Sequence, residues 1–497
     1  MNKPLHNALE RLQDRSLLRH QSYVDGGWTD ADNGATFAVH DPATNQLLAP
    51  VANNGAAEVE RAIAAADAAL PAWRDKTAKD RANLLRRWYD LMMANADDLG
   101  IIMTAEQGKP LSEAKGEVTY GASFIEWFAE EGKRVCGDVL ASTWADRRMV
   151  VLKQPIGVCA AITPWNFPIA MITRKVAPAL AAGCTIVVKP AEQTPLSALA
   201  MAELAHRAGI PKGVLNIVTG DSANSIAIGK VLCASPIVRH LSFTGSTPVG
   251  RILMQQSAPS IKKLGLELGG HAPFIVFDDA DIDAAVEGAI VSKYRNAGQT
   301  CVCTNRIYAH EAIYDVFVQK LARKAAELKV GNGFEAGVAQ GPLIDDQAVA
   351  KVREHISDAV GKGARLVTGG QLVPGLGSQR FIEPTVLADA TPDMLIAREE
   401  TFGPVAAVFK FKDEREVVAL ANDTEFGLAS YFYSRDIGRV WRVAEKLEYG
   451  MVGINTGLIS NEVAPFGGVK QSGLGREGSK YGIDDYLELK YLCMGGV

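Results

Sequence analysis

The sequence predicts an α/β protein built from two doubly wound α/β domains and a small β arm. From Met149 onward, short apolar strands alternate with helices, with strands at 157–163, 185–189, 214–218, 238–243 and 262–268 and helices at 198–207 and 225–232. This alternation is typical of a parallel sheet with helices on both faces. A second run starts near His271, with strands at 274–277 and 306–309 and helices at 312–328 and 348–361.

Two segments outside these runs alternate apolar and polar residues as edge strands do. They lie at 148–153 and 484–492 and belong to neither predicted sheet. An unpaired strand edge is an aggregation hazard, so we expect these segments to form an oligomerisation arm.

The region before residue 138 is predicted to be mainly helical. After a short amphipathic segment at the N-terminus, a strand and turn at 39–45 precede three helical blocks, at 56–73, from Thr77 onward, and at 111–134. Thr77 stands three residues before Asp80, which resembles a capping box. Apolar residues recur in these blocks at helical spacing, so we interpret their methionines and aromatic residues as core.

Length and composition exclude several classes of function. A chain of 497 residues predicts roughly three domains. A net charge of -5 and an isoelectric point near 6.0 give no basic surface for nucleic acid or anionic membrane. The sequence shows neither a signal peptide nor a membrane span, and its seven cysteines follow no disulfide or metal spacing. We therefore expect a cytoplasmic protein without a resident metal.

Three residues are candidates for catalysis. Cys301 ends a polar stretch at 294–301, where a thiolate would be a strong nucleophile, although a lone cysteine is more often a buried structural thiol. Asn166 lies in a rigid loop of prolines and aromatics after a strand, where its amide could stabilise an oxyanion. Glu267 is a lone acid in an apolar strand, which indicates either a carboxyl with a raised pKa or one satisfied by backbone amides.

Two strand ends are candidates for dinucleotide binding. The segment 243–250 is a glycine-containing turn between a strand and a helix, but it lacks the G-x-G-x-x-G fingerprint. Lys189 and Glu192 follow another strand, where they would either hold ribose hydroxyls or form a solvated loop.

Together, these motifs resemble the aldehyde dehydrogenase superfamily in order and spacing, from Tyr23 to the final strand. The matching segments are 164–166, 266–270, 298–301, 400–404 and 466–473. Within the superfamily, the sequence is most similar to the succinate-semialdehyde dehydrogenases, through segments 171–175, 301–303 and 475–482.

The resemblance implies three domains and an assembly of two or four copies. The cofactor domain would comprise 1–138 and 157–268, the catalytic domain 269–456, and the arm with the C-terminal segment 139–156 and 457–497. Cys301 would be the nucleophile, Glu267 the base, and Asn166 an oxyanion donor together with the Cys301 amide. The implied cofactor residues are Ile162, Trp165, Lys189, Glu192, Gly245, Ser246, Glu400 and Phe402. Those implied for the substrate carboxylate are Arg174, Arg295 and Ser460.

The implied activity is the NAD(P)-dependent oxidation of succinate semialdehyde to succinate, a step in GABA degradation. It would proceed through a thiohemiacetal and a thioester on Cys301, hydrolysed by water that Glu267 activates. Because Glu192 would repel a 2′-phosphate, NAD is favoured over NADP.

Three alternatives remain open. The same chemistry could act on another aldehyde such as glutarate semialdehyde. Acyl transfer to coenzyme A is disfavoured by Glu267, and a catalytically idle binding relative is disfavoured by the intact Cys301, Glu267 and Asn166. Cys303 either packs beside the site or acts as a redox partner of Cys301.

Overall fold

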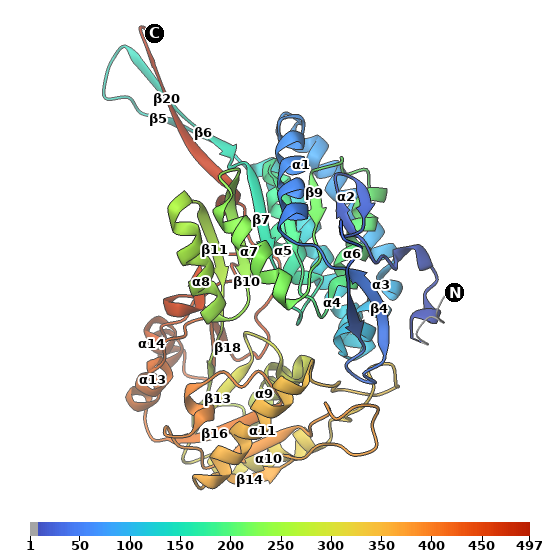
Figure 1. The fold of residues 1–497 in the computed structure, drawn as a ribbon. Helices are drawn as coiled ribbons and strands as arrows, with labels where there is room; N and C mark the ends of the chain where they lie inside the picture. Colours follow the sequence, from blue (N-terminus) through green and yellow to red (C-terminus); the bar gives the residue numbers. More distant parts are fainter. Residues whose placement is uncertain (1–7) are drawn as a thin grey trace.

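The computed structural model, which describes residues 8–497, contains two large mixed sheets flanked by helices (Figure 1). The first sheet has the strand order β19-β11-β10-β7-β8-β9-β1-β2, and the second has the order β14-β15-β16-β13-β12-β17-β18. The predicted α/β class is confirmed. Residues 1–7 of the expected N-terminal segment lie outside the described part.

The first sheet has five parallel strands at its centre, and its strand order reverses between β7 and β10. Its parallel strands are β7 (Val158–Ile162), β8 (Thr185–Lys189), β9 (Leu215–Ile217), β10 (Val238–Thr244) and β11 (Lys263–Glu267). Antiparallel edges are added by β1 (Ser22–Val24), β2 (Gly27–Thr29) and β19 (Gly473–Leu474). Open α/β sheets bind ligands at the carboxyl ends of strands beside such a reversal.

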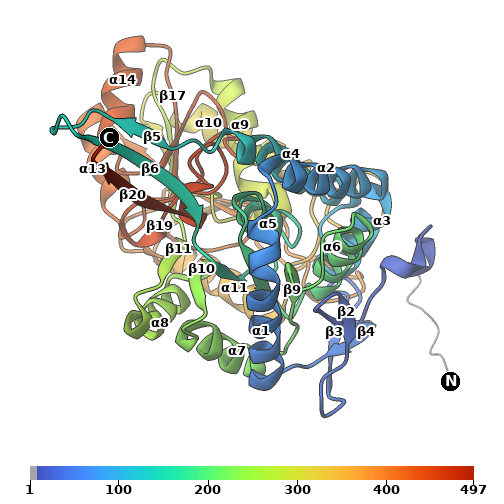
Figure 2. The ribbon, with the colours of Figure 1, turned by 90° about the horizontal axis from the view of Figure 1, so that it is seen from above.

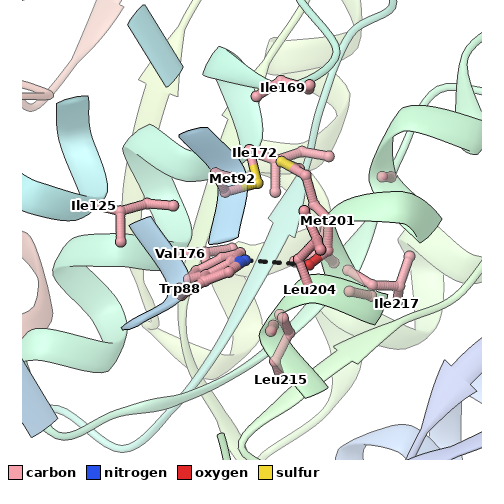
Figure 3. Packing of buried hydrophobic residues seen from close by; sticks show 14 of the residues in the cluster. Trp88, Met92, Ile125, Ile169, Ile172, Val176, Met201, Leu204, Leu215 and Ile217 are labelled. Carbon is pink, nitrogen blue, oxygen red and sulfur yellow. Dashed lines mark hydrogen bonds between the residues drawn. The ribbon is translucent and has the colours of Figure 1, made fainter. Parts of the chain in front are cut away.

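Helices cover both faces of this sheet (Figure 2). One face carries α1 (Ala56–Arg74), α7 (Ser222–Ala234) and α8 (Thr247–Ser257). The other carries α5 (Ala170–Ala182) and α6 (Pro195–Arg207), with α2 (Ala78–Ala94), α3 (Ala96–Gln107) and α4 (Leu111–Glu131) packed outside them. Figure 3 shows the apolar core on this second face, where the Trp88 indole donates to the Met201 carbonyl at 3.2 Å.

The prediction of three helical blocks in the N-terminal region was wrong by one helix. Thr77 caps α2 as predicted, with its hydroxyl oxygen accepting from the Asp80 amide at 3.2 Å. Only Asn95 separates α2 from α3, and α3 is buried from Asp98 to Gln107. A helix buried on all sides has no polar face, so apolar periodicity could not reveal it.

The second sheet has six parallel strands, β12 (Ala272–Val276), β13 (Thr304–His310), β15 (Thr385–Ala388), β16 (Val405–Phe411), β17 (Ala429–Tyr433) and β18 (Met451–Ile454), with β14 (Arg365–Thr368) antiparallel at one edge. Its helices are α9 (Ile282–Tyr294), α10 (Tyr314–Ala326), α11 (Asp346–Gly361), α12 (Leu395–Arg398), α13 (Glu414–Asn422) and α14 (Ile437–Lys446). The predicted strands and helices of this run are present with slightly different bounds.

The two orphan segments pair with each other and project from the molecule (Figures 1 and 2). Strands β20 (Leu487–Gly495) and β6 (Arg147–Pro155) are antiparallel along their whole length, and β5 (Asp138–Leu140) adds a third strand. The predicted start of the last strand was wrong, because Asp484–Tyr486 forms a 3-10 helix. Tyr486 is buried there against His240, with ring centroids 4.8 Å apart, and this packing fixes the base of the arm. A separate hairpin, β3 (Thr36–His40) and β4 (Leu47–Ala52), accounts for the predicted strand and turn.

Candidate active site

The candidate residues come from the facing ends of the two sheets. Asn166 follows β7, Gly245 and Ser246 follow β10, and Glu267 ends β11, so all lie at carboxyl ends of the first sheet. Cys301 precedes β13 and Glu400 precedes β16, at amino ends of the second sheet. The strand reversal of the first sheet therefore faces the loop that contains the candidate nucleophile.

A turn in left-handed backbone brings Cys301 to this junction. Asn296, Ala297 and Gly298 have φ values of 51°, 54° and 73° in succession. The left-handed conformation costs about 1–3 kcal/mol at each of the two residues that are not glycine, Asn296 and Ala297. Backbone strain of this kind is typical of functional sites. A Cβ on Gly298 would lie 2.2 Å from the Gly403 carbonyl oxygen, so glycine is required there.

The Cys301 thiol is protonated at neutral pH in the free protein. Burial raises its pKa to about 12, and the positive charge of Arg174 opposes part of that rise. The residue itself retains partial solvent exposure. A base must therefore take the proton before sulfur can attack an electrophile.

Glu267 is a buried acid whose carboxylate has no fixed partner. Its relative exposure is 4%, and neither oxygen accepts a hydrogen bond from the residues that the structure describes. Burial raises its pKa well above the ordinary range, and the nearby Glu477 raises it further, while Arg174 lowers it. Of the two interpretations of this acid, the structure supports the carboxyl with a raised pKa over the one satisfied by backbone amides.

Asn166 lies against the segment that precedes Cys301. Its side-chain Nδ2 donates to the Gln299 carbonyl at 3.0 Å, while Oδ1 has no hydrogen-bond partner among the described residues. The Nδ2 group has a second hydrogen, which can serve a further acceptor. The geometry thus brings an amide donor beside the candidate nucleophile.

Arg174 and Lys175 on α5 share one carboxylate. The Arg174 Nε lies 3.0 Å from Glu477 Oε2, and Lys175 pairs with the other Glu477 oxygen and donates to Thr244 Oγ1 at 2.6 Å. The Arg174 guanidinium is 3.8 Å from the Phe466 ring centroid, and its Nη2 has no partner within residues 8–497. A buried guanidinium nitrogen left unpaired marks a place for an anion.

The other predicted substrate residues are less constrained. The Arg295 guanidinium lies 5.4 Å from the Phe167 ring centroid and forms no ion pair with any described residue. Ser460 is half-buried in the loop before the Asn461 turn, where Asn461 Oδ1 accepts from the Val463 and Ala464 amides at 3.1 and 2.9 Å. No contact in the described chain joins Ser460 to either arginine.

The predicted cofactor residues at β8 and β10 form two groups. Lys189 Nζ lies 3.4 Å from Glu192 Oε2, and Ser222 Oγ donates to Glu192 Oε1 at 2.8 Å. The Gly245 amide donates to the Glu267 carbonyl at 3.0 Å, and Ser246 is the exposed N-cap of α8. A Cβ on Gly245 would lie 2.4 Å from the Phe243 ring, so any other residue would require that ring to shift.

A third group combines residues from both sheets. Glu400 Oε1 accepts from the Gly270 amide at 3.2 Å, and burial raises the pKa of Glu400 to about 7. The rings of Trp165 and Phe402 pack edge to face with centroids 5.6 Å apart. Ile162 ends β7, one residue before the Asn166 loop.

These groups fit a dinucleotide. The exposed N-terminus of α8 offers amides and a positive dipole end to pyrophosphate. Carboxylates at Glu192 and Glu400 are acceptors for ribose hydroxyls. When bound, the dinucleotide supplies a hydride acceptor.

Cys303 is buried at the start of β13. Its thiol donates to the Lys293 carbonyl at 3.4 Å, and burial raises its pKa. Both Cys301 and Cys303 have free thiols. Across residues 8–497 no cluster of three His, Cys, Asp or Glu side chains could bind a metal, and no described helix is long and apolar enough to cross a bilayer.

Sequence reasoning assigned no role to three further charged residues at the junction. They are Lys109, Glu117 and Glu477, all largely buried. A signal existed for Glu117, which is an acid among apolar residues of a predicted helix. None existed for Lys109, which lies outside the predicted elements. Glu477 lies in segment 475–482, which carries the resemblance, but no role was assigned to it.

The chain was compared with known proteins. The model of the aldehyde dehydrogenase family matches residues 28–492. A glutarate-semialdehyde dehydrogenase of Pseudomonas aeruginosa is 66% identical, over 98% of this chain and 100% of its own length. An NADP(+) succinate-semialdehyde dehydrogenase of Escherichia coli is 62% identical, over 98% and 100%. The solved structure of a succinate-semialdehyde dehydrogenase from Burkholderia pseudomallei is 68% identical with a TM-score of 0.96, covering 98% of this chain and 100% of that one. The chain belongs to the aldehyde dehydrogenase family.

Proposed function

We propose that the protein oxidises a short aldehyde whose far end carries a carboxylate. Succinate semialdehyde is the first candidate substrate. The observation that supports this most is the unpaired Nη2 of Arg174, buried beside Arg295 and the candidate nucleophile. The names of two similar proteins agree with a carboxylated substrate, because they describe dehydrogenases of glutarate semialdehyde and of succinate semialdehyde. Glutarate semialdehyde is the second candidate, supported by the relatives with that name.

The chemistry follows from the groups at the junction. The Cys301 sulfur adds to the aldehyde carbon, and the carbonyl oxygen accepts hydrogen bonds from Asn166 Nδ2 and the Cys301 amide. Loss of hydride from that carbon, for which a bound NAD(P) would be the acceptor, leaves a thioester on Cys301. Glu267, once it has passed the thiol proton to solvent, removes a proton from water, which attacks the thioester; that proton returns to the departing sulfur, and the carboxylic acid and the thiol are released.

The raised pKa values of Cys301 and Glu267 suit this sequence. A thiol with a pKa near 12 transfers its proton poorly to an ordinary carboxylate. Because the Glu267 pKa is also raised, the difference between donor and acceptor is smaller. The same basicity makes Glu267 a better base toward water in the second half-reaction.

We infer that the cofactor is NAD(P), with NAD preferred. Glu192 accepts from Ser222 beside Lys189, its carboxylate oxygens suit ribose hydroxyls, and its charge opposes a 2′-phosphate. Lys189 beside it offsets part of that repulsion. The site residues, the three-domain division, and assembly as a homodimer or homotetramer through the arm belong to the same proposal. Exposed apolar residues on the arm, including Val139, Leu489 and Tyr491, support its role in assembly.

The test is a panel of aldehydes with both cofactors, followed by two variants. Wild-type enzyme should form reduced cofactor fastest with succinate or glutarate semialdehyde. Cys301→Ala should form none, whereas Glu267→Gln should still give a burst of about one equivalent, at a lower rate because the thiol has lost its base, and then little turnover. Equal loss of burst and steady rate in Glu267→Gln would assign Glu267 to the first half-reaction alone. A wild-type preference for neutral aldehydes would refute the carboxylate proposal.

A further inference from the structure

A buried ion pair lies directly behind the Asn166 loop. Lys109 and Glu117 are 2% and 3% exposed and bind each other through their charged ends. Lys109 lies between α3 and α4, and Glu117 lies on α4. The Lys109 ammonium also donates to the Asn166 carbonyl at 2.8 Å and lies 4.0 Å from the Phe167 ring centroid. The lysine therefore contacts the backbone of the residue whose side chain faces the nucleophile segment.

Glu117 fixes the other end of the same loop. Its Oε1 accepts from the amides of Ile169 and Ala170 at 2.9 and 3.3 Å, where α5 begins. Its Oε2 binds Lys109. One carboxylate thus links the start of α5 to the lysine that contacts Asn166.

Asn296 extends the network to the turn before Cys301. Its side-chain Nδ2 donates to the Asn166 carbonyl at 3.0 Å and to the Gln299 carbonyl at 3.2 Å. Gln107, at the end of α3, donates to Asn296 Oδ1 at 3.0 Å. The same corner between α3 and α4 thereby supports the loop of Asn166 and the turn of Cys301.

We propose that Lys109 and Glu117 are positioning residues, which hold the Asn166 amide where the oxyanion forms. The inference rests on the proposed function of Asn166. Stability alone does not explain a fully buried ion pair, because apolar residues of similar size are often as stabilising. An apolar side chain at residue 109, however, cannot donate to the Asn166 carbonyl. Small displacements of a catalytic group lower rates steeply, on the order of 100-fold for 1 Å.

The experiment compares single and double variants of this pair. Lys109→Met and Glu117→Gln should each lower the melting temperature, because each leaves one buried charge without its partner. Each should also slow the burst of reduced cofactor at saturating aldehyde by about 10-fold to 100-fold, with little change in KM. The double variant Lys109→Met/Glu117→Gln contains no unpaired charge, so its melting temperature should recover while its burst stays slow. Recovery of the burst rate together with stability would overturn the proposal.

A double-mutant cycle with Asn166 gives a second, independent outcome. If Lys109 acts through Asn166, Lys109→Met should cause no further loss of burst rate in an Asn166→Ala enzyme. Multiplicative losses would overturn the proposal even if the double variant of the pair remained unstable. Lys262→Met is the matched control, because Lys262 is also buried and donates to the carbonyls of Leu232, Ser235 and Val238, away from the junction. It should lower stability without slowing the burst.

These results separate failure of the inference from failure of the proposed function. The burst is measured with whichever aldehyde the wild-type enzyme oxidises fastest. Absence of any reduced cofactor from wild type with every aldehyde would refute the proposed function. A normal wild-type burst that the Lys109 variant retains would refute the positioning role alone.

Discussion

Replacing Arg174 should reveal whether the enzyme recognises a carboxylate on its substrate. Arg174 is 1% exposed, and its Nη2 faces no partner among residues 8–497. Arg174→Met removes this donor and roughly keeps the side-chain volume. Glu477 keeps its contact with Lys175 in the variant, so the substitution does not leave a bare buried carboxylate. The protein should therefore fold, although with reduced stability.

The magnitude follows from the contact that is lost. A hydrogen bond to a charged group contributes about 1.5–3 kcal/mol, and each 1.4 kcal/mol is about tenfold in binding, so kcat/KM for succinate semialdehyde should fall by roughly 10-fold to 150-fold. Butanal has the same chain length and no carboxylate, so its kcat/KM should change only through the electrostatics of the site. Arg174 also lowers the pKa of Glu267 and Cys301, and that effect applies to both aldehydes.

The assay measures kcat/KM for succinate semialdehyde, glutarate semialdehyde and butanal at one pH. The ratio of either semialdehyde to butanal isolates the contact with the carboxylate. Lys175→Met is the matched control, because it also removes a cation from Glu477 but on the side of Thr244. That control should leave the ratio unchanged. An unchanged ratio in Arg174→Met would show that this guanidinium does not bind the substrate carboxylate.

Three further predictions concern the cofactor and the two cysteines. Glu192→Ser should shift the ratio of kcat/KM for NAD and NADP toward NADP, because it removes a negative charge from the ribose site; better wild-type efficiency with NADP would contradict this. Because burial raises the Cys301 pKa to about 12, its alkylation by iodoacetamide should rise about tenfold per pH unit from pH 7 to 9. An alkylation rate that stops rising below pH 8 would show that the Cys301 pKa is lower than this. Peroxide should inactivate the enzyme reversibly, and Cys303→Ala, active in reductant, should recover less after the same dose, because Cys303 can trap a sulfenic acid on Cys301. Equal recovery would leave Cys303 with a packing role only.

The sequence predicted the parallel strands of the first sheet well because they have clear local patterns, whereas it located only β12 and β13 of the seven strands of the second sheet. Strand β8 was predicted with the bounds the structure gives, β10 differs by one residue at one end, and β7 and β11 differ by one residue at each end. Each is a short apolar run between helices, which periodicity detects. The strands β6 and β20 were recognised by their alternation, and their pairing follows from the need to satisfy both edges.

Among the fully buried helices, α6 was predicted at 198–207, whereas α3 and α5 were missed. Helix α5 is buried from Ala170 to Ala182 and contains Pro178, so it shows neither a polar face nor a clean helical run. Its charged residues Arg174 and Lys175 therefore gave no sign of their environment. Only the fold shows that both reach Glu477, which lies about 300 residues away in the sequence.

The same limit explains why the supporting residues of the site were missed. Cys301, Glu267 and Asn166 stand in motifs of unusual local composition, so the sequence alone could mark them as chemically active. Lys109 stands in a short connection between two helices and Glu117 within a helix, and their role depends on a contact with a loop 57 residues away from Lys109. Local patterns indicate which groups could react, whereas the packing of separate elements decides which groups hold them in place. A site formed between two sheets depends on both, since neither sheet alone could fix the distance from the amide of Asn166 to the sulfur of Cys301.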